Sequence, residues 1–326
     1  MSELINNIHW GIIGLGHIAR SFAEDLQLVE DASLYAVGSR SEEKAKTFGE
    51  EFKAQKCYGS YDALLADPKV DIVYIATPHD SHAAISIKAL RAGKHVLCEK
   101  PVSISADEFQ EIEKTADESN RFFMEGLWSE FNPCLNEIKQ KISNREIGEV
   151  KYLNAQFAFK VDRPLTSRLL DKKLAGGALL DIGIYPIYLA YSVLGIPEEI
   201  TATAKFHPIT GVDMQTAMIF DYPNAQALLY CNFNSNSGTA ARISGTEGEI
   251  IIHDQWYQSE SYSIFKDGET EKFEVPKLGR GYTHEIIECH ECIRGNRKQS
   301  EHWSHQNSAD LMRLLDAVRE KIGLEY

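Results

Sequence analysis

Short apolar runs alternate with helical patterns through the first third of the chain. The runs have the length and composition of buried strands, and segments with helical patterns separate them. The predicted strands cover residues 8–13, 33–38, 71–76, 95–98 and 122–125. Such alternation of strand and helix is typical of a parallel, doubly wound sheet.

A different pattern follows residue 128. A helix at 132–143 leads into a long strand at 150–159, and a long apolar segment comes next. Shorter strands then follow in close succession at 200–207, 214–221, 226–234, 239–244, 249–253, 262–265 and 271–275, with helices at 281–293 and 306–322. Because turns such as 222–224 separate these strands by only a few residues, we expect an antiparallel or mixed sheet.

These patterns predict an α/β protein with two domains. Residues 1–126 form the expected Rossmann domain, a doubly wound parallel sheet. Residues 127–326 form the expected second domain, an α+β domain that carries a large, mostly antiparallel sheet; its role in binding substrate is implied by a family resemblance described below. The predicted helices cover one face of that sheet, so we expect its open face to form a homodimer.

Composition and charge narrow the possible functions. The chain has 326 residues, enough for two cores, and 43% of them are hydrophobic and 25% charged, as in ordinary soluble proteins. The formal net charge of −14 argues against binding to nucleic acid or to an anionic membrane. An anionic cofactor stays compatible with it, because helix N-termini and local cations supply a positive field.

Two segments could be mistaken for membrane or export signals. Residues 1–4 lack a basic region followed by a long apolar region, so we expect no signal peptide and a cytoplasmic protein. Residues 174–197 are nearly all apolar and long enough to span a membrane, but Asp181 and Pro186 interrupt them. We interpret this segment as a buried helix.

The cysteines indicate reduced thiols and no metal site. Six cysteines are scattered along the chain, which favours an intracellular protein. The sequence Cys-His-Glu-Cys at 289–292, with histidines at 284, 302 and 305, has a shorter spacing than a zinc finger. It also lies on an apolar helical stripe, so we expect packed or exposed helix residues there and no metal.

A glycine-rich turn joins the first predicted strand to the helix after it. Gly14 and Gly16 allow a sharp turn and close approach of a ligand, and the small Ala19 lets the helix pack on the strand. The N–H groups at His17 and Ile18 would then face a pyrophosphate. The alternative is a tight connection without a ligand, but the strand–helix–strand context favours dinucleotide binding.

The end of the second strand bears on the choice of cofactor. Enzymes that use NAD usually place a carboxylate there to bind the ribose 2′-hydroxyl. This chain instead has Ser39 and Arg40, which could hold a 2′-phosphate. We therefore expect NADP, with NAD possible; the alternative is that Arg40 is a solvated residue near Glu42 and Glu43.

Two further segments carry candidate catalytic residues. Glu99 and Lys100 end a parallel strand, where ligands bind in open α/β sheets, and Pro101 restricts the backbone of Lys100. Asp181 and Tyr185 are four residues apart and share a face if their segment is helical. The alternatives are a solvated lysine at a strand end, a capping aspartate and a core tyrosine.

Together these motifs resemble one family along nearly the whole chain. The shared features are the glycine turn, Ala76-Thr77-Pro78 with His82, Glu99-Lys100-Pro101, and the run Gly176-Gly177, Asp181, Gly183 and Tyr185. They are similar to those of the Gfo/Idh/MocA oxidoreductases. Tyrosine at 185, with Met124 to Trp128 upstream, resembles the branch of dimeric dihydrodiol dehydrogenases and NADP-dependent xylose dehydrogenases.

The resemblance implies a division of roles. The N-terminal domain would bind a nicotinamide dinucleotide, and substrate would lie between it and the C-terminal domain. Thr77 and Pro78, with His82 as a less certain member, would line the nicotinamide end, and Glu99, Lys100 and Pro101 would meet ribose and substrate. Tyr185 would act as acid/base with help from Lys100.

Elementary chemistry agrees with these roles. Hydride transfer at a carbinol carbon requires a proton to leave or reach the oxygen. A free tyrosine has a pKa of about 10, and a nearby ammonium such as that of Lys100 would lower it toward neutral pH. Asp181 would orient Lys100 or a substrate hydroxyl. Trp128, Phe157 and Tyr282 are candidates for an aromatic substrate wall, although core packing is the more ordinary role of Phe157.

The sequence thus predicts an NADP-dependent dehydrogenase or reductase. Its substrate would be a secondary alcohol or ketone, namely a sugar, a polyol or a cyclic diol. The reaction would take place at a CH–OH or CH–CH group. The alternative is a non-catalytic regulator of the same fold that binds the dinucleotide. The presence of both Lys100 and Tyr185 favours the enzyme, because a sensor does not need them.

Overall fold

The structure, a computed structural model, describes residues 7–326, and within it the chain forms two compact units. Of the described residues, the first unit contains 7–128 and Leu278–Ala309, and the second contains Ser129–Lys277 and Asp310–Tyr326. One unit holds a parallel sheet and the other a mostly antiparallel sheet, so the predicted fold class is confirmed. The expected boundary at residue 126 differs from this division, because residues 278–309 group with the first unit.

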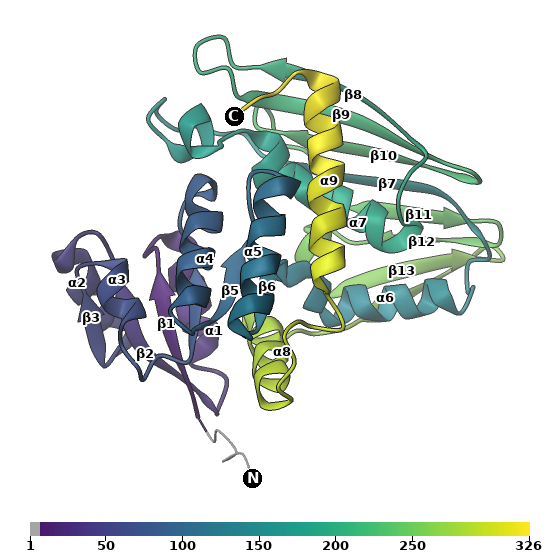
Figure 1. Ribbon diagram of the computed structural model, residues 1–326. Helices are drawn as coiled ribbons and strands as arrows, with labels where there is room; N and C mark the ends of the chain where they lie inside the picture. Colours follow the sequence, from purple (N-terminus) through teal and green to yellow (C-terminus); the bar gives the residue numbers. More distant parts are fainter. Residues whose placement is uncertain (1–6) are drawn as a thin grey trace. The chain divides into compact units, whose positions relative to one another are not determined.

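The first unit is built on a six-stranded parallel sheet in the order β3-β2-β1-β4-β5-β6 (Figure 1). Its strands are β1 (Ile8–Ile13), β2 (Ala32–Gly38), β3 (Lys56–Tyr58), β4 (Ile72–Ile75), β5 (His95–Glu99) and β6 (Phe123–Gly126). All the strands predicted from apolar runs are present, and the short edge strand β3 is additional. The order reverses between β1 and β4, which is where ligands bind in such sheets.

Helices cover this sheet. They are α1 (His17–Leu26), α2 (Glu42–Phe52), α3 (Tyr61–Leu65), α4 (His82–Arg91), α5 (Ala106–Ser119) and α8 (Tyr282–Arg294). Serine side chains at 41, 60 and 105 cap α2, α3 and α5 by accepting backbone N–H groups of the first turn. By contrast, α1 begins at Gly16 with no side-chain cap.

Long-range polar contacts bring α8 into the first unit. The fully buried His290 accepts a hydrogen bond from the Trp10 indole at 2.9 Å and contacts Asp31 at 3.1 Å. Cys289 and Cys292 are buried beside it in the core. The 289–292 sequence is therefore part of the packing between α8 and the sheet. Across residues 7–326, no group of three or more His, Cys, Asp or Glu is arranged to hold a metal ion.

The second unit is built on an eight-stranded sheet in the order β14-β13-β12-β11-β7-β10-β9-β8. Its strands are β7 (Val150–Ala158), β8 (Glu199–Phe206), β9 (Asp213–Tyr222), β10 (Ala225–Asn232), β11 (Ala241–Gly245), β12 (Gly248–Ile252), β13 (Ser261–Lys266) and β14 (Glu269–Glu274). Only the β7–β10 pairing is parallel among those described. Its helices include α6 (Pro133–Ser143), α7 (Ile184–Leu194) and most of α9 (His305–Ile322).

Alternation along the central strands separates a covered face from an open face. Cys231 and Leu229 of β10 are buried on the side where α7 packs, whereas Leu228 of the same strand is 36% exposed. Leu228 is paired with Ile219 of β9, which is 42% exposed. A shallow hollow of about 300 Å³ lies on this face, lined by residues of β7 to β10 that include Asn154, Thr201, Thr203 and Tyr230.

The apolar segment before β8 is a core element. Within the part of the chain that the structure describes, residues Lys172–Leu194 are the one helical stretch whose length and composition would suit a membrane span. However, 78% of that window is buried inside the protein. A mostly buried core helix passes the same test, which agrees with the interpretation as a buried helix. The segment contains a π-helix (Leu179–Gly183) that runs directly into α7.

Candidate active site

The glycine turn of the first unit has the backbone that a phosphate-binding loop requires. Gly14 has φ +91°, and a Cβ there would lie 2.6 Å from the Ala76 carbonyl, so only glycine fits. A Cβ at Gly16 would meet nothing within 4 Å, so this position opens outward. With no side-chain cap and no acidic residue in its first turn, α1 presents its N–H groups to an anion.

The end of β2 carries the residues predicted to choose the cofactor. Ser39 is buried, and its hydroxyl accepts the Ser41 backbone N–H at 3.2 Å. Arg40 is exposed, and among residues 7–326 it forms no ion pair. Glu42, which could have neutralised it, pairs with Lys46 at 2.8 Å. The guanidinium of Arg40 is therefore available to a ligand.

His82 connects two of the predicted cofactor loops. It is fully buried at the start of α4. Its Nδ1 lies 2.7 Å from the Pro101 carbonyl, and its Nε2 lies 2.8 Å from the Thr77 carbonyl. Pro101 follows Lys100 through a cis peptide bond, and Pro78 begins the short helix η1 (His79–Ser81). His82 thus fixes the spacing of the loops that follow β4 and β5.

Lys100 follows a buried acidic cluster. The Glu99 carboxylate accepts a short hydrogen bond from the Tyr74 hydroxyl and the Lys100 backbone N–H at 3.2 Å. Glu285 of α8 is fully buried, and both its carboxyl oxygens lack a hydrogen-bond partner in the part of the chain described. Burial, together with the charges of Glu99 and Asp25, raises the pKa of Glu285 well above its ordinary value. Burial therefore favours the protonated form of the Glu285 carboxyl.

A second buried carboxyl fixes the loop after Pro101. Glu125 of β6 accepts the Val102 backbone N–H at 3.0 Å. Its other oxygen accepts the Trp303 indole at 3.1 Å and the Ser308 hydroxyl at 2.7 Å. Sequence reasoning missed Glu125, because its partners lie far away in the chain.

Two of the three predicted aromatic residues meet in the first unit. The rings of Trp128 and Tyr282 stack with centroids 5.0 Å apart and planes 8° from parallel. Tyr282 begins α8, so the position of this helix determines the stack. The third residue, Phe157, belongs to the second unit.

Phe157 joins a different aromatic cluster around Tyr185. Tyr185 is 5% exposed, and its ring centroid lies 5.5 Å from that of Phe157 and 5.4 Å from that of Tyr257. Phe157 stacks on Tyr257 at 4.1 Å. Tyr257 lies in the short helix η6 (Trp256–Gln258), and sequence reasoning missed it because a single aromatic residue in a loop carries no pattern.

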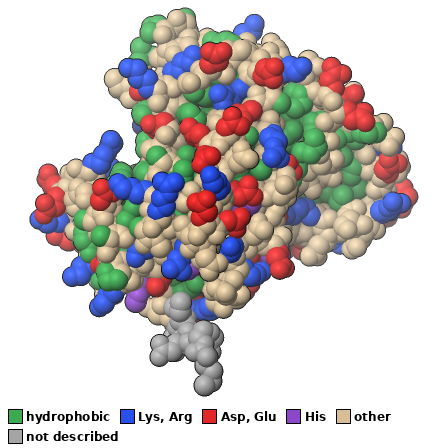
Figure 2. Space-filling view, viewed as in Figure 1, with side chains coloured by type: hydrophobic (Ala, Val, Ile, Leu, Met, Phe, Trp, Pro, Cys, Tyr) green, Lys and Arg blue, Asp and Glu red, His purple; other side chains and the backbone are tan. Residues whose placement is uncertain are grey.

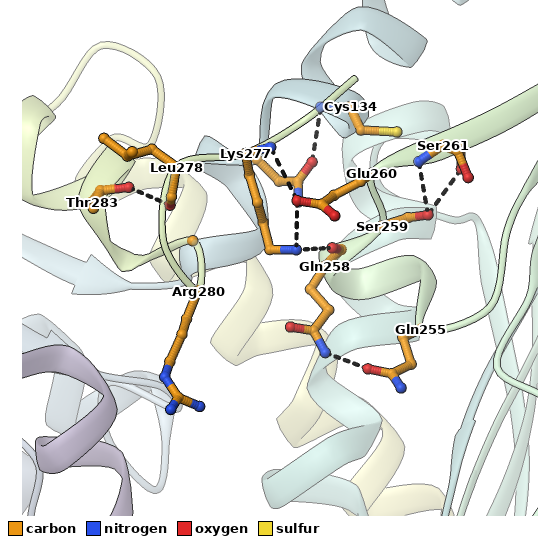
Figure 3. A network of polar contacts seen from close by, with 12 residues as sticks. Cys134, Gln255, Gln258, Ser259, Glu260, Ser261, Lys277, Leu278, Arg280 and Thr283 are labelled. Atoms are coloured by element: carbon orange, nitrogen blue, oxygen red, sulfur yellow. Dashed lines mark hydrogen bonds and ion pairs between the residues drawn. The ribbon is translucent and has the colours of Figure 1, made fainter. Parts of the chain in front are cut away.

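Lys277 contacts the residues that follow Tyr257 in the chain, and Figure 3 shows its contacts with Gln258 and Glu260. Its ammonium donates to the Gln258 carbonyl at 3.1 Å and pairs with Glu260 at 3.3 Å. Its backbone N–H also donates to the Glu260 carboxylate at 3.2 Å. These contacts hold η6 against the start of β13.

Asp181 lies within the π-helix and faces a cation. The Arg168 guanidinium donates to the Asp181 carboxylate at 3.1 Å. Asp181 is 7% exposed, whereas the Arg168 side chain is 43% exposed. The sequence predicted Lys100 or a substrate hydroxyl as the partner of Asp181; within the second unit Arg168 is a partner of this carboxylate, and the predicted role stays a prediction.

The turn before this π-helix is fixed by a further buried carboxylate. Asp213 of β9 is fully buried and accepts the Leu179 N–H at 2.8 Å and the Thr216 hydroxyl at 2.9 Å. Burial raises the pKa of Asp213 to about 6. The sequence gives Asp213 no motif that would single it out.

Of the predicted catalytic residues, Lys100 lies on the first unit, and Asp181 and Tyr185 lie on the second. Lys100 directly follows the parallel strand β5, and Tyr185 lies among aromatic rings in the first turn of α7, next to the π-helix. That they act together on one substrate stays a prediction.

The first unit has the architecture of a dinucleotide-binding Rossmann fold, which defines the class of protein. Residues 8–127 match the model of an oxidoreductase family with an NAD-binding Rossmann fold, and residues 135–251 match the model of the GFO/IDH/MocA C-terminal domain. The chain belongs to the Gfo/Idh/MocA oxidoreductase family, as the motifs predicted.

Known proteins are similar to the chain over nearly its whole length. The trans-1,2-dihydrobenzene-1,2-diol dehydrogenase of Xenopus tropicalis is 33% identical, with 97% of this chain and 98% of that protein covered. The human protein of the same name is 31% identical, with 98% of each covered. A 3-ketoreductase from Actinomadura kijaniata, solved with NADP and TDP-benzene, is 26% identical with a TM-score of 0.89 over 97% of this chain and 98% of that one.

These comparisons settle the class of activity. The protein is an oxidoreductase with a Rossmann domain for NAD or NADP. The residues present fit such a cofactor, because Gly14 leaves no room for a side chain and the N-terminus of α1 has no competing cap. The predicted recognition, fold and class of function are confirmed.

Asp213→Asn is expected to change the pH dependence of stability. Because the folded pKa of Asp213 is raised to about 6 from about 3.9 in the unfolded chain, its stabilising contribution is complete below about pH 4. That contribution is lost as pH rises through 6. Between pH 4 and pH 7, the free energy of unfolding of the wild type should therefore fall by about 2–3 kcal/mol relative to that of the variant.

Urea unfolding at several pH values measures this difference. Asp221→Asn is the matched control, because Asp221 lies at the other end of the same strand and is partly exposed. If the wild type and Asp213→Asn show parallel pH profiles, Asp213 is ionised in the fold and the interpretation is wrong.

Proposed function

We propose that the protein is an NADP-dependent dehydrogenase or reductase of a sugar, polyol or cyclic diol. It would transfer a hydride between the nicotinamide ring and a carbon that carries a secondary alcohol or ketone. The observation that carries this proposal is the setting of Tyr185, a nearly buried phenol among aromatic rings directly after a π-helix that presents a carboxylate. Short π-helical turns occur often at functional sites.

The residues suit proton transfer at the reacting oxygen. When bound, the nicotinamide ring supplies or accepts the hydride. Tyr185 donates or accepts the proton of the substrate oxygen, and the charge of Lys100 lowers the pKa of the phenol toward operating pH. Asp181, oriented by Arg168, binds a substrate hydroxyl. The rings of Phe157 and Tyr257 give the sugar or cyclic diol an apolar face to pack on.

The relatives support this range of substrates. Those at 31–33% identity are named dihydrodiol dehydrogenases, and solved neighbours include a 3-ketoreductase and, at 25% identity and a TM-score of 0.88, an aldose–aldose oxidoreductase from Caulobacter crescentus complexed with glycerol. Structures of the 3-ketoreductase include variants in which one lysine or one tyrosine is replaced. These are the residue types to which our proposal gives the chemistry.

The proposal of NADP rests on Arg40. Its exposed guanidinium has no ion pair with any residue from 7 to 326, and it stands where a 2′-phosphate would come if the cofactor lies across the glycine turn. The hydroxyls of Ser39 and Ser41 flank it. No carboxylate follows β2 directly to repel a phosphate.

We also propose that two copies associate through the open face of the eight-stranded sheet. Exposed apolar side chains of neighbouring strands are paired in register there, as for Leu228 and Ile219. On the neighbouring strand β8, the small polar residue Thr201 is paired with Ile219 of β9. A second copy of the same sheet would present an equally flat and apolar surface. On the face that Figure 2 shows, positively and negatively charged side chains are interspersed.

Tyr185→Phe is expected to lower kcat by about 10²–10⁴-fold, because it removes only the hydroxyl that exchanges the proton. NADP reduction is followed by absorbance of the reduced ring on a panel of aldoses, polyols and trans-dihydrodiols. Tyr191→Phe is the matched control, because Tyr191 lies on the same helix and its hydroxyl donates to Asp310 at 3.0 Å. Near wild-type kcat in Tyr185→Phe would exclude this residue as the acid/base.

Arg40→Ala is expected to weaken NADPH binding by about 10-fold or more, the loss that follows removal of one charge-assisted hydrogen bond. NADH affinity should stay the same, since NADH has no 2′-phosphate. Titration by fluorescence of the reduced cofactor measures both, with Lys44→Ala on α2 as a control for loss of a neighbouring positive charge. Equal NADPH affinity in Arg40→Ala and wild type contradicts the proposal.

Ile219→Glu is expected to convert the protein from dimer to monomer, because it places a charge in the centre of the proposed interface. Sedimentation velocity at micromolar concentration reports the change. Ile209→Glu is the control, because Ile209 is 76% exposed in the turn between β8 and β9. A monomeric wild type would rule out the assembly.

A further inference from the structure

The turn that precedes the π-helix lies between two side chains from distant parts of the second unit. Asp213 begins β9, and Tyr326 follows α9. The turn itself is Gly176-Gly177, and Ala178 joins it to the π-helix. The mechanism proposed above uses neither Asp213 nor Tyr326.

Asp213 holds the turn from the core. Its Oδ2 accepts a hydrogen bond of 2.8 Å from the backbone N–H of Leu179, which is the first residue of the π-helix. A second bond, from the Thr216 hydroxyl at 2.9 Å, fixes the carboxyl to its own strand. Its Oδ1 is buried and lacks a hydrogen-bond partner among residues 7–326. The carboxyl therefore serves as an N-terminal acceptor for the π-helix.

Tyr326 holds the turn from the other side. Its hydroxyl donates to the Gly176 carbonyl at 2.8 Å. The Arg319 guanidinium lies 5.0 Å from the centroid of the Tyr326 ring, and Arg319 is in turn paired with Asp316 at 2.9 Å. Burial raises the pKa of the Tyr326 phenol well above its ordinary value, with the charges of Asp213 and Asp181 adding to the effect. The phenol thus stays protonated as a donor.

The surroundings of the turn leave no room for a side chain at either glycine. Gly177 has φ +123°, and a Cβ there would lie 2.2 Å from Asp213 Oδ1 and 3.2 Å from the Tyr326 hydroxyl oxygen. A Cβ at Gly176 would lie 2.4 Å from the Arg168 carbonyl. Both glycines are therefore in contact with the groups that hold them.

What the turn fixes is the start of the segment with the candidate catalytic residues. Asp181 is two residues beyond Leu179, whose N–H Asp213 binds, and Tyr185 follows in the first turn of α7. A π-helical turn has a different rotation per residue from an α-helix, so a change at its start rotates every side chain after it.

We propose that Tyr326 and Asp213 are positioning residues that clamp the Gly176-Gly177 turn and so set the orientation of Asp181 and Tyr185. They act through the backbone of the turn. The consequence for catalysis rests on the proposed function of Tyr185, whereas the clamp itself is a property of the fold. The two can therefore be tested apart.

Hydrogen exchange of the Tyr326→Phe variant tests the clamp. The substitution keeps the ring beside Arg319 and removes only the bond to the Gly176 carbonyl. We expect amides in the peptide covering 177–185 to exchange about fivefold faster, as loss of one ordinary hydrogen bond implies. Tyr222→Phe is the matched control. The Tyr222 hydroxyl donates at 3.3 Å to the carbonyl of Gly195, which follows the C-terminal end of α7, so this variant removes the same kind of bond away from the turn. Unchanged exchange in 177–185 would overturn the inference.

Steady-state kinetics on a substrate from the panel test the consequence. Tyr326→Phe should lower kcat about fivefold, with KM for NADPH and the pH profile unchanged because Tyr185 is intact. Faster exchange without any turnover by the wild type would leave the clamp supported and the proposed function refuted. A lower kcat with unchanged exchange would refute the clamp and leave the proposed function standing. Faster exchange with unchanged kcat would refute the positioning role.

Discussion

The carboxylate of Asp25 organises the first unit. It accepts the backbone N–H groups of Arg280 at 2.9 Å, Gly281 at 3.0 Å and Tyr282 at 2.8 Å, so a buried anion caps the N-terminus of α8. Backbone N–H groups and the helix dipole both favour a negative charge at that place. Asp25 lies near the end of α1, whose opposite end carries the open glycine turn. One ten-residue helix therefore connects the cofactor loop with α8.

Several features of the site depend on this attachment. With α8 in place, Tyr282 stacks on Trp128 and Glu285 is enclosed behind Glu99. His290 reaches the indole of Trp10 on the central strand. The aromatic wall, the acidic cluster next to Lys100 and the core of the parallel sheet are thus properties of one packing arrangement. A substitution of Asp25 would therefore disturb the packing of the aromatic wall, the acidic cluster and the core of the parallel sheet.

Patterns along the sequence were sufficient for elements with local signals. Apart from the short edge strand β3, the strands of both sheets follow from apolar runs. The glycine turn and the buried character of the segment around Asp181 follow from glycines and the spacing of polar residues. The grouping of α8 with the first unit does not, because it depends on hydrogen bonds between residues about 255 apart, such as Arg280 and Asp25. Asp213, Glu125 and Tyr257 were missed for the same reason: each gains its role from partners that only the fold supplies. The π-helix was missed because the apolar residues around it are buried on all sides, which removes any periodicity.

Buried acids also change how the charge of the protein should be understood. The formal net charge of −14 treats every carboxyl as ionised. Burial raises the pKa of Glu125 and Glu285, both of which belong to the unit that carries Lys100. Burial therefore disfavours the ionised form of these two carboxyls, and counting both as ionised gives an upper bound on the negative charge of this unit. This suits the role proposed for the ammonium of Lys100 and the binding of a negatively charged cofactor.

The six cysteines lead to a practical consequence. Five are buried, Cys57 is partly exposed, and burial raises the pKa of every one of these thiols. Thiolate is the form that reacts with electrophiles, so the five buried thiols should react slowly with alkylating reagents in the native protein. Cys98 lies in the six-stranded sheet and Cys231 in the eight-stranded sheet, so each unit contains a buried thiol whose labelling would require that unit to open. Labelling at these positions would record how often each core opens.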